Sequence, residues 1–231
     1  MILAQILLEF HWTNLLQPQF YIENGGLWLL LFVVFAETGL FAGFFLPGDS
    51  LLFVAGIYST DLANEVVKLD NSVAQLLVLF LLISTAGILG NFVGYWFGKK
   101  SGPFLYHRKD TFFFKKKYLF QAKEFYDDHG MLAIIIARFL PFIRTFAPIV
   151  AGIVAMDFKK FALYNIIGCL AWVFSMLFAG HFLQKWILEQ FQFDLKDHLE
   201  IIVIGIVAVT TAPVLWKVFF PKKKAAKNNN E

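Results

Sequence analysis

Long apolar runs are the feature of this sequence that most restricts its fold. An apolar stretch of about 20 residues is long enough for one helix to cross a bilayer. Hydrophobic residues make up 58% of the 231-residue chain and charged residues only 16%, a balance more apolar than a soluble core needs. Five apolar stretches stand out, at about 26–58, 74–98, 131–156, 160–183 and 200–220. We therefore predict an all-α polytopic membrane protein.

The same pattern excludes several other classes of protein. Strands of an outer-membrane barrel would alternate apolar and polar residues instead of running continuously apolar. The single Cys169 rules out a disulfide framework. The sequence has no His-Glu-x-x-His motif, no Gly-x-Ser-x-Gly motif, no phosphate-binding P-loop and no Cys/His cluster. We therefore expect neither an enzyme nor a resident metal or cofactor.

The distribution of basic residues predicts which loops face the cytoplasm. Segment 99–130 and the tail 221–231 are rich in lysine and arginine, whereas loops 59–73 and 184–200 carry more acids than bases. By the positive-inside rule, the first two lie in the cytoplasm and the other two lie outside. The C-terminus is thus predicted to be cytoplasmic. Beside apolar spans, the basic tail indicates membrane orientation and not nucleic-acid binding.

Two of the five stretches do not fit a simple crossing. Residues 26–58 are too many for one span and too few for two full spans with a turn, and Pro47-Gly48 lies near their centre. Residues 131–156 contain Pro141 and Pro148, and the order of inside and outside loops makes them enter and leave on the cytoplasmic face. We expect two opposed re-entrant helical hairpins and about three full spans, at 74–98, 160–183 and 200–220. An N-terminus inside the cell would instead make 26–58 one kinked span.

A weak internal repeat supports an inverted arrangement of two halves. Each half has a proline-broken stretch that ends in Ala-Gly, followed by a span with an Asn-x-x-Gly motif and a tryptophan. In transporters built from inverted repeats, the substrate site lies near the bilayer midplane between the halves. The matching residues are Ala55-Gly56, Asn91-Phe-Val-Gly94 and Trp96 in the first half, and Ala151-Gly152, Asn165-Ile-Ile-Gly168 and Trp172 in the second.

Four charged residues lie inside apolar stretches, with Glu37 and Asp49 in the first hairpin and Arg138 and Arg144 in the second. A charge at the centre of a membrane helix costs roughly 2.5–3.5 kcal/mol, so four unpaired charges would cost on the order of 10–14 kcal/mol. The two hairpins can neutralise each other where they meet. Two interpretations stay open: static ion pairs that lock the hairpins together, or a polar cavity for an anionic or zwitterionic substrate.

The cavity interpretation gives these residues separate roles. Arginine binds phosphate through its planar fork, so Arg138 and Arg144 are the candidate phosphate ligands. A buried carboxylate gains proton affinity, so Glu37 and Asp49 are the candidate proton carriers. Six further residues are expected to break the hairpins or line the cavity: Pro47, Gly48, Pro141, Pro148, Asn91 and Asn165.

The remaining segments flank a single transmembrane domain, which we place at residues 26–220. Residues 1–25 have apolar side chains at helical spacing and are predicted to form an amphipathic segment at the interface. Segment 99–130 mixes aromatic residues with lysines, which predicts an amphipathic cytoplasmic loop on an anionic leaflet. The tail 221–231 is predicted to be disordered.

These motifs resemble the DedA family, also called the VTT or SNARE-associated Golgi protein domain family. The resemblance covers roughly residues 26–183. Glu37 and Asp49 match the family's functional acids, and Arg138 and Arg144 match its arginines. The matching motifs are Glu37-Thr-Gly-Leu-Phe-Ala-Gly-Phe-Phe-Leu-Pro-Gly-Asp49, Gly90-Asn-Phe-Val-Gly-Tyr-Trp-Phe-Gly98, Ala137-Arg-Phe-Leu-Pro-Phe-Ile-Arg-Thr-Phe-Ala-Pro148, Ala151-Gly152 and Asn165.

The resemblance implies a multi-pass protein of the bacterial inner membrane that moves a lipid phosphate between leaflets, with undecaprenyl phosphate as the favoured substrate. It also implies dependence on the proton-motive force. Other branches of the family handle phospholipids. Two alternatives stay open: a membrane scaffold or assembly factor that transports nothing, and a proton-coupled small-ion antiporter. The expected partners are a membrane lipid and protons, with a homo-oligomer left open.

Overall fold

The computed structural model describes residues 18–40, 46–107, 124, 141–199, 201–206 and 208. These residues are helical or lie in turns between helices, and they contain no strand, which confirms the all-α prediction for this part of the chain. Several predictions fall outside the described residues. These are the N-terminal segment before residue 18, most of the loop 99–130, the start of the second hairpin with Arg138, most of the span 200–220, and the tail.

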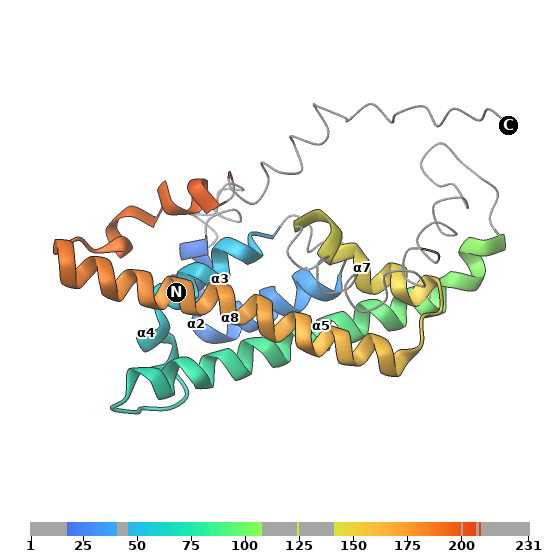
Figure 1. Cartoon of the computed structure of the whole chain (residues 1–231), viewed down its shortest axis with the longest axis horizontal. Coiled ribbons are helices and arrows are strands. Elements are labelled where there is room, and N and C mark those ends of the chain that lie inside the picture. The colour runs from blue at the N-terminus through green and yellow to red at the C-terminus, as the bar shows by residue number, and fades with distance from the viewer. Residues whose placement is uncertain are drawn as a thin grey trace, which may run out of the picture.

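Two long helices form the frame of the molecule. Helices α5 (Ser72–His107) and α8 (Phe158–Phe191) run in opposite directions along its longest axis (Figure 1). Both contain apolar segments long enough to cross a membrane, Ser72–Phe104 and Phe158–Phe191. Each helix extends beyond the span expected from its apolar run, because hydropathy marks only the part of a helix that suits lipid. Charged flanking residues still favour helix and prolong it.

Local signals fix where these helices begin and end. The Asn71 side chain accepts a hydrogen bond from the backbone N–H of Val73 at 2.8 Å, at the start of α5. Asp157 caps α8 in the same way by accepting from Lys160 N–H at 3.0 Å. Gln192 adopts a left-handed conformation with φ of 53° and ends α8. Such caps satisfy backbone groups that have no partner inside the helix.

Helix α2 (Pro18–Gly39) is broken at Gly26, whose φ of 54° and ψ of −145° suit only glycine. The N–H of Leu27, just after the break, donates to the Glu65 carboxylate at 3.0 Å. A side chain at Gly26 would collide with that carboxylate. The break falls where the sequence places the boundary between the interfacial segment and the transmembrane domain.

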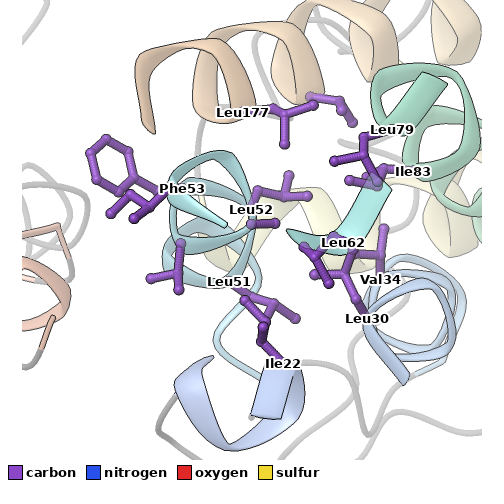
Figure 2. Close-up of a cluster of buried hydrophobic side chains, with 14 of the residues drawn as sticks. Ile22, Leu30, Val34, Leu51, Leu52, Phe53, Leu62, Leu79, Ile83 and Leu177 are labelled. Atoms are coloured by element: carbon purple, nitrogen blue, oxygen red, sulfur yellow. The ribbon is translucent and has the colours of Figure 1, made fainter. Parts of the chain in front are cut away.

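The short helix α3 (Gly48–Ile57) lies at the centre of the fold, and all ten of its residues are buried. Figure 2 shows Leu51 and Leu52 of α3 among side chains from helix α2, the following short helix α4 (Ser59–Asn64), α5 and α8. The core is therefore built around α3 and not between the two long helices alone. Its labelled members are Ile22, Leu30, Val34, Leu51, Leu52, Phe53, Leu62, Leu79, Ile83 and Leu177.

Each short helix packs on the long helix of the other half of the sequence. Helix α3 packs mainly on α8, while α7 (Pro141–Ile153) packs mainly on α5. Glycines allow close approach at both crossings, and the contacts are equivalent. At the crossing of α3 and α8, a Cβ at Gly56 would meet the carbonyl of Leu177 and the amide of His181. At the crossing of α7 and α5, a Cβ at Gly152 would meet the carbonyl of Tyr95 and the amide of Lys99.

The reverse contacts match as well. A Cβ at Gly180 would meet the Phe53 carbonyl, and a Cβ at Gly98 would meet the Ile149 carbonyl. The two crossings therefore use residues at the same spacing on each helix. By this register Gly98 corresponds to Gly180, whereas the Asn-x-x-Gly motifs would have aligned Gly94 with Gly168. The repeat in the short helices thus agrees with the sequence pattern, and the register of the long helices differs from it.

Candidate functional site

Three of the four charged residues singled out in the sequence meet at one buried point. Glu37 lies near the end of α2, Asp49 in the first turn of α3, and Arg144 in the first turns of α7. Glu37 is 2% exposed and the Arg144 side chain 9% exposed. Arg138 lies outside the described residues. The acids of the first half and an arginine of the second half therefore form a single cluster.

The Arg144 guanidinium bridges the two acids. Its Nη2 donates to Glu37 Oε1 at 2.5 Å, and its Nη1 donates to Asp49 Oδ1. Charge-assisted hydrogen bonds of this kind are short and strong. Loss of the Arg144 charge would be strongly destabilising, because it would leave two buried carboxylates without compensation. Among the described residues, two carboxylates share one guanidinium, so this trio carries one excess negative charge.

Helix α8 adds a fourth residue, Trp172, which the sequence interpretation did not place in the site. Its Nε1–H donates to Asp49 Oδ1 at 2.8 Å, and its ring lies 4.8 Å from the Arg144 Cζ. Trp172 is 1% exposed. The repeat pairs Trp172 with Trp96, but Trp96 is 61% exposed and its ring faces Lys100 instead. The pattern therefore pointed to two tryptophans without showing which one is buried beside charge.

Gly48 provides the space that the Glu37 carboxylate occupies. A Cβ at Gly48 would overlap this carboxylate. Because Gly48 begins α3, the acid also lies at the positive end of that helix, as Asp49 does in the first turn. Pro47 precedes the helix, and its carbonyl accepts hydrogen bonds from Leu51 N–H at 2.7 Å and Ser50 Oγ at 3.1 Å.

Of the other residues expected to break the hairpins or line a cavity, Pro148 and Asn165 lie in contacts between helices. Pro148 is buried inside α7, close to Gly94 of α5. Asn91 donates to the Gly87 carbonyl of its own helix at 2.6 Å, and Asn165 donates across helices to the Ile88 carbonyl at 3.4 Å. Helix α7 begins at Pro141, whose side chain is not described. The described residues contain no group of three or more His, Cys, Asp or Glu side chains that could hold a metal ion.

This arrangement matches a known domain. The VTT domain covers residues 46–182, more than half of the chain. The chain belongs to the VTT domain family, the DedA family. That span includes Asp49, Arg144 and Trp172, whereas Glu37 precedes it.

Relatives of this VTT-domain chain are membrane proteins of bacteria. It is 38% identical to Protein DedA of Escherichia coli (strain K12) over 205 residues, or 87% of each chain. It is 33% identical to an uncharacterised membrane protein of Mycobacterium leprae over 222 residues, or 92% of each. Inner membrane protein YqjA of Escherichia coli is 31% identical over 162 residues, 70% of this chain and 69% of that one. No solved structure matches. The chain is thus a DedA-family membrane protein.

Proposed function

We propose that this chain is a transporter, not an enzyme, that moves the phosphate head of a lipid across the bacterial inner membrane. The observation that carries the proposal is the buried Arg144 guanidinium, which carboxylates from two other helices share. Undecaprenyl phosphate is the lipid that the family resemblance favours. The name of the relative YqjA supports an inner-membrane location.

The lengths of the short helices favour two re-entrant hairpins. Helix α3 has 10 residues and α7 has 13, or about 15 and 20 Å, less than the roughly 30 Å of a hydrocarbon core. Backbone that enters and leaves on one face is tolerated only where protein covers it or water fills a cavity, and α3 is buried throughout. The equivalent glycine contacts support opposite orientations of the two halves. In this arrangement α5, α8 and the stretch 200–220 are the full spans.

The chemistry of Arg144 suits a phosphate that competes with the two acids. Arginine offers five N–H donors in a planar fork that matches phosphate and carboxylate alike. In the described structure Glu37 and Asp49 occupy two of its nitrogens, and the buried Nε has no hydrogen-bond partner among the described atoms. When a lipid phosphate displaces a carboxylate, Arg144 would therefore keep an anionic partner, with the phosphate in place of the carboxylate. We propose Arg138 as a second phosphate ligand.

Protons enter this exchange through the carboxylates. Two carboxylates that share a site resist being ionised together. Once Glu37 or Asp49 is protonated, it holds Arg144 less strongly, and the guanidinium becomes available to phosphate. Loss of the proton on the other side of the membrane would restore the ion pair and release the lipid. This coupling gives the inward proton gradient a means to drive phosphate movement.

The test is reconstitution of the purified chain in liposomes that contain undecaprenyl phosphate. A phosphatase added outside hydrolyses only the outer-leaflet lipid, unless the protein brings inner-leaflet lipid to it. We expect the protein to make the inner-leaflet pool accessible and an inward proton gradient to accelerate the process. Parallel liposomes with a fluorescent phospholipid identify a broader lipid transporter. If neither lipid moves, the transporter proposal is wrong, and a scaffold or small-ion antiporter becomes the better account.

A further inference from the structure

The side of the site formed by α8 contains one residue with a defined geometry and no role in the proposed exchange. We propose that Trp172 is a positioning residue of the phosphate site: it holds Asp49 in place and packs its ring against Arg144, which leaves the Nε–H of the guanidinium for an anion. This inference rests on the proposed function.

The indole N–H of Trp172 binds the carboxylate of Asp49. Asp49 Oδ1 accepts from Arg144 Nη1 and from Trp172 Nε1, the latter at 2.8 Å. An indole nitrogen can only donate, and a buried donor needs a partner. When an anion takes the place of Asp49 on Arg144, Trp172 still binds that carboxylate. Asp49 therefore stays beside the guanidinium and is ready to displace the anion again.

The Trp172 ring contacts the guanidinium of Arg144. Arg144 Cζ lies 4.8 Å from the centroid of Trp172, within the range of a cation–π contact. The indole ring thereby lies against the guanidinium, and the carboxylates occupy Nη1 and Nη2. The Nε–H is left as a buried donor without a hydrogen-bond partner among the described atoms. A phosphate that accepts from this edge can add to the site before it displaces a carboxylate.

The charged groups that face Asp49 decide the expected pH response. Among the described residues they are Glu37 on α2 and Arg144 on α7, while α8 contributes only the neutral Trp172. A donor to the ionised carboxylate favours that form over the protonated one. Loss of the indole N–H should therefore let protonation, and with it transport, begin at a higher pH.

The experiment measures proton-dependent movement of undecaprenyl phosphate in liposomes against external pH, with thermal unfolding of the same samples. Trp172→Phe keeps an aromatic ring and removes the N–H, and Trp172→Leu removes both. Incorporation of benzothienylalanine at position 172 replaces the N–H with sulfur at nearly unchanged ring size, so the packing of the ring is kept. Trp186→Phe is the matched control, because Trp186 lies on the same helix but is 55% exposed.

We expect Trp172→Phe and the benzothienyl variant to raise the pH of half-maximal transport by about one unit, as loss of one hydrogen bond to a charged group implies. Trp172→Leu should in addition raise the apparent KM for the lipid about tenfold, because the cation–π contact is lost. Trp186→Phe should behave as wild type. If the wild-type protein is active and the benzothienyl variant has an unchanged pH profile, the role proposed for Trp172 is wrong, while the proposed function stands. An inactive wild-type protein would instead overturn the proposed function.

Discussion

Arg144 is the residue on which both the stability and the chemistry of the site depend. Lysine would keep the charge but offers a compact ammonium that lacks the planar fork. We expect Arg144→Lys to insert and fold while lipid movement falls at least about tenfold, the cost of one charged hydrogen bond. Transport in liposomes with thermal unfolding of the same protein checks this. Wild-type transport by Arg144→Lys and by Arg138→Lys would rule out fork-like phosphate recognition.

Glycine is required at position 48 because the Glu37 carboxylate occupies the space of a side chain, and not because of the backbone conformation there. A methyl group there would overlap the Glu37 carboxylate and displace it from Arg144. Overpacking of this kind costs roughly 1–3 kcal/mol. We expect Gly48→Ala to lower the melting temperature and to impair transport. Gly205→Ala is the control, because nothing lies within 4 Å of a Cβ at that position. Equal behaviour of the two variants would contradict the placement of Glu37 over Gly48.

The sequence predicted the partners at the site better than it predicted their geometry. Buried charge is costly, so acids in one half and arginines in the other were expected to meet, and the structure brings Glu37 and Asp49 to Arg144. Neither hydropathy nor spacing reveals that Trp172 donates to Asp49, because that contact depends on how α3 crosses α8. For the same reason, the role of Gly48 follows only from the position of Glu37.

At the scale of helices, the two equivalent crossings are the feature most open to test. Gly56 lies against α8 and Gly152 against α5, each facing backbone atoms that cannot move aside. We expect Gly56→Ala and Gly152→Ala to destabilise the protein by similar amounts, about 1–3 kcal/mol each. The measurement is the thermal unfolding of both variants, with Gly205→Ala as the control. A loss at only one of the two glycines would argue against equivalent halves.

The helices also show where sequence reasoning has limits. The apolar runs located α5 and α8, because lipid-compatible length is a direct property of sequence. Their ends at His107 and Phe191 lie beyond those runs. The weak repeat found the Ala-Gly ends of the short helices, but its Asn-x-x-Gly match gave a register for the long helices that differs from the glycine contacts. Helix register depends on close backbone approach, which a short motif does not specify.

For the whole molecule, the charge distribution of the loops predicts the sides of the membrane. Single cysteines introduced near residues 62–70 should react with an impermeant reagent from outside, and those near 107–117 from the cytoplasm. The native Cys169 is fully buried and should give little background. Labelling of both loops from one face would contradict the topology, and with it the opposed hairpins.

We propose that the carboxylates of Glu37 and Asp49 take up protons during transport and do not merely lock the hairpins together. The deciding measurement is lipid movement against external pH in liposomes containing Glu37→Gln or Asp49→Asn, with thermal stability recorded on the same samples. Asp70→Asn, at an exposed acid, serves as the control. A proton carrier predicts that both site variants stay folded and lose pH-dependent transport, because an amide resembles a permanently protonated carboxyl. Full pH-dependent transport by both variants would contradict the claim, as would a loss of about 3–5 kcal/mol of stability that alone explains the lost activity.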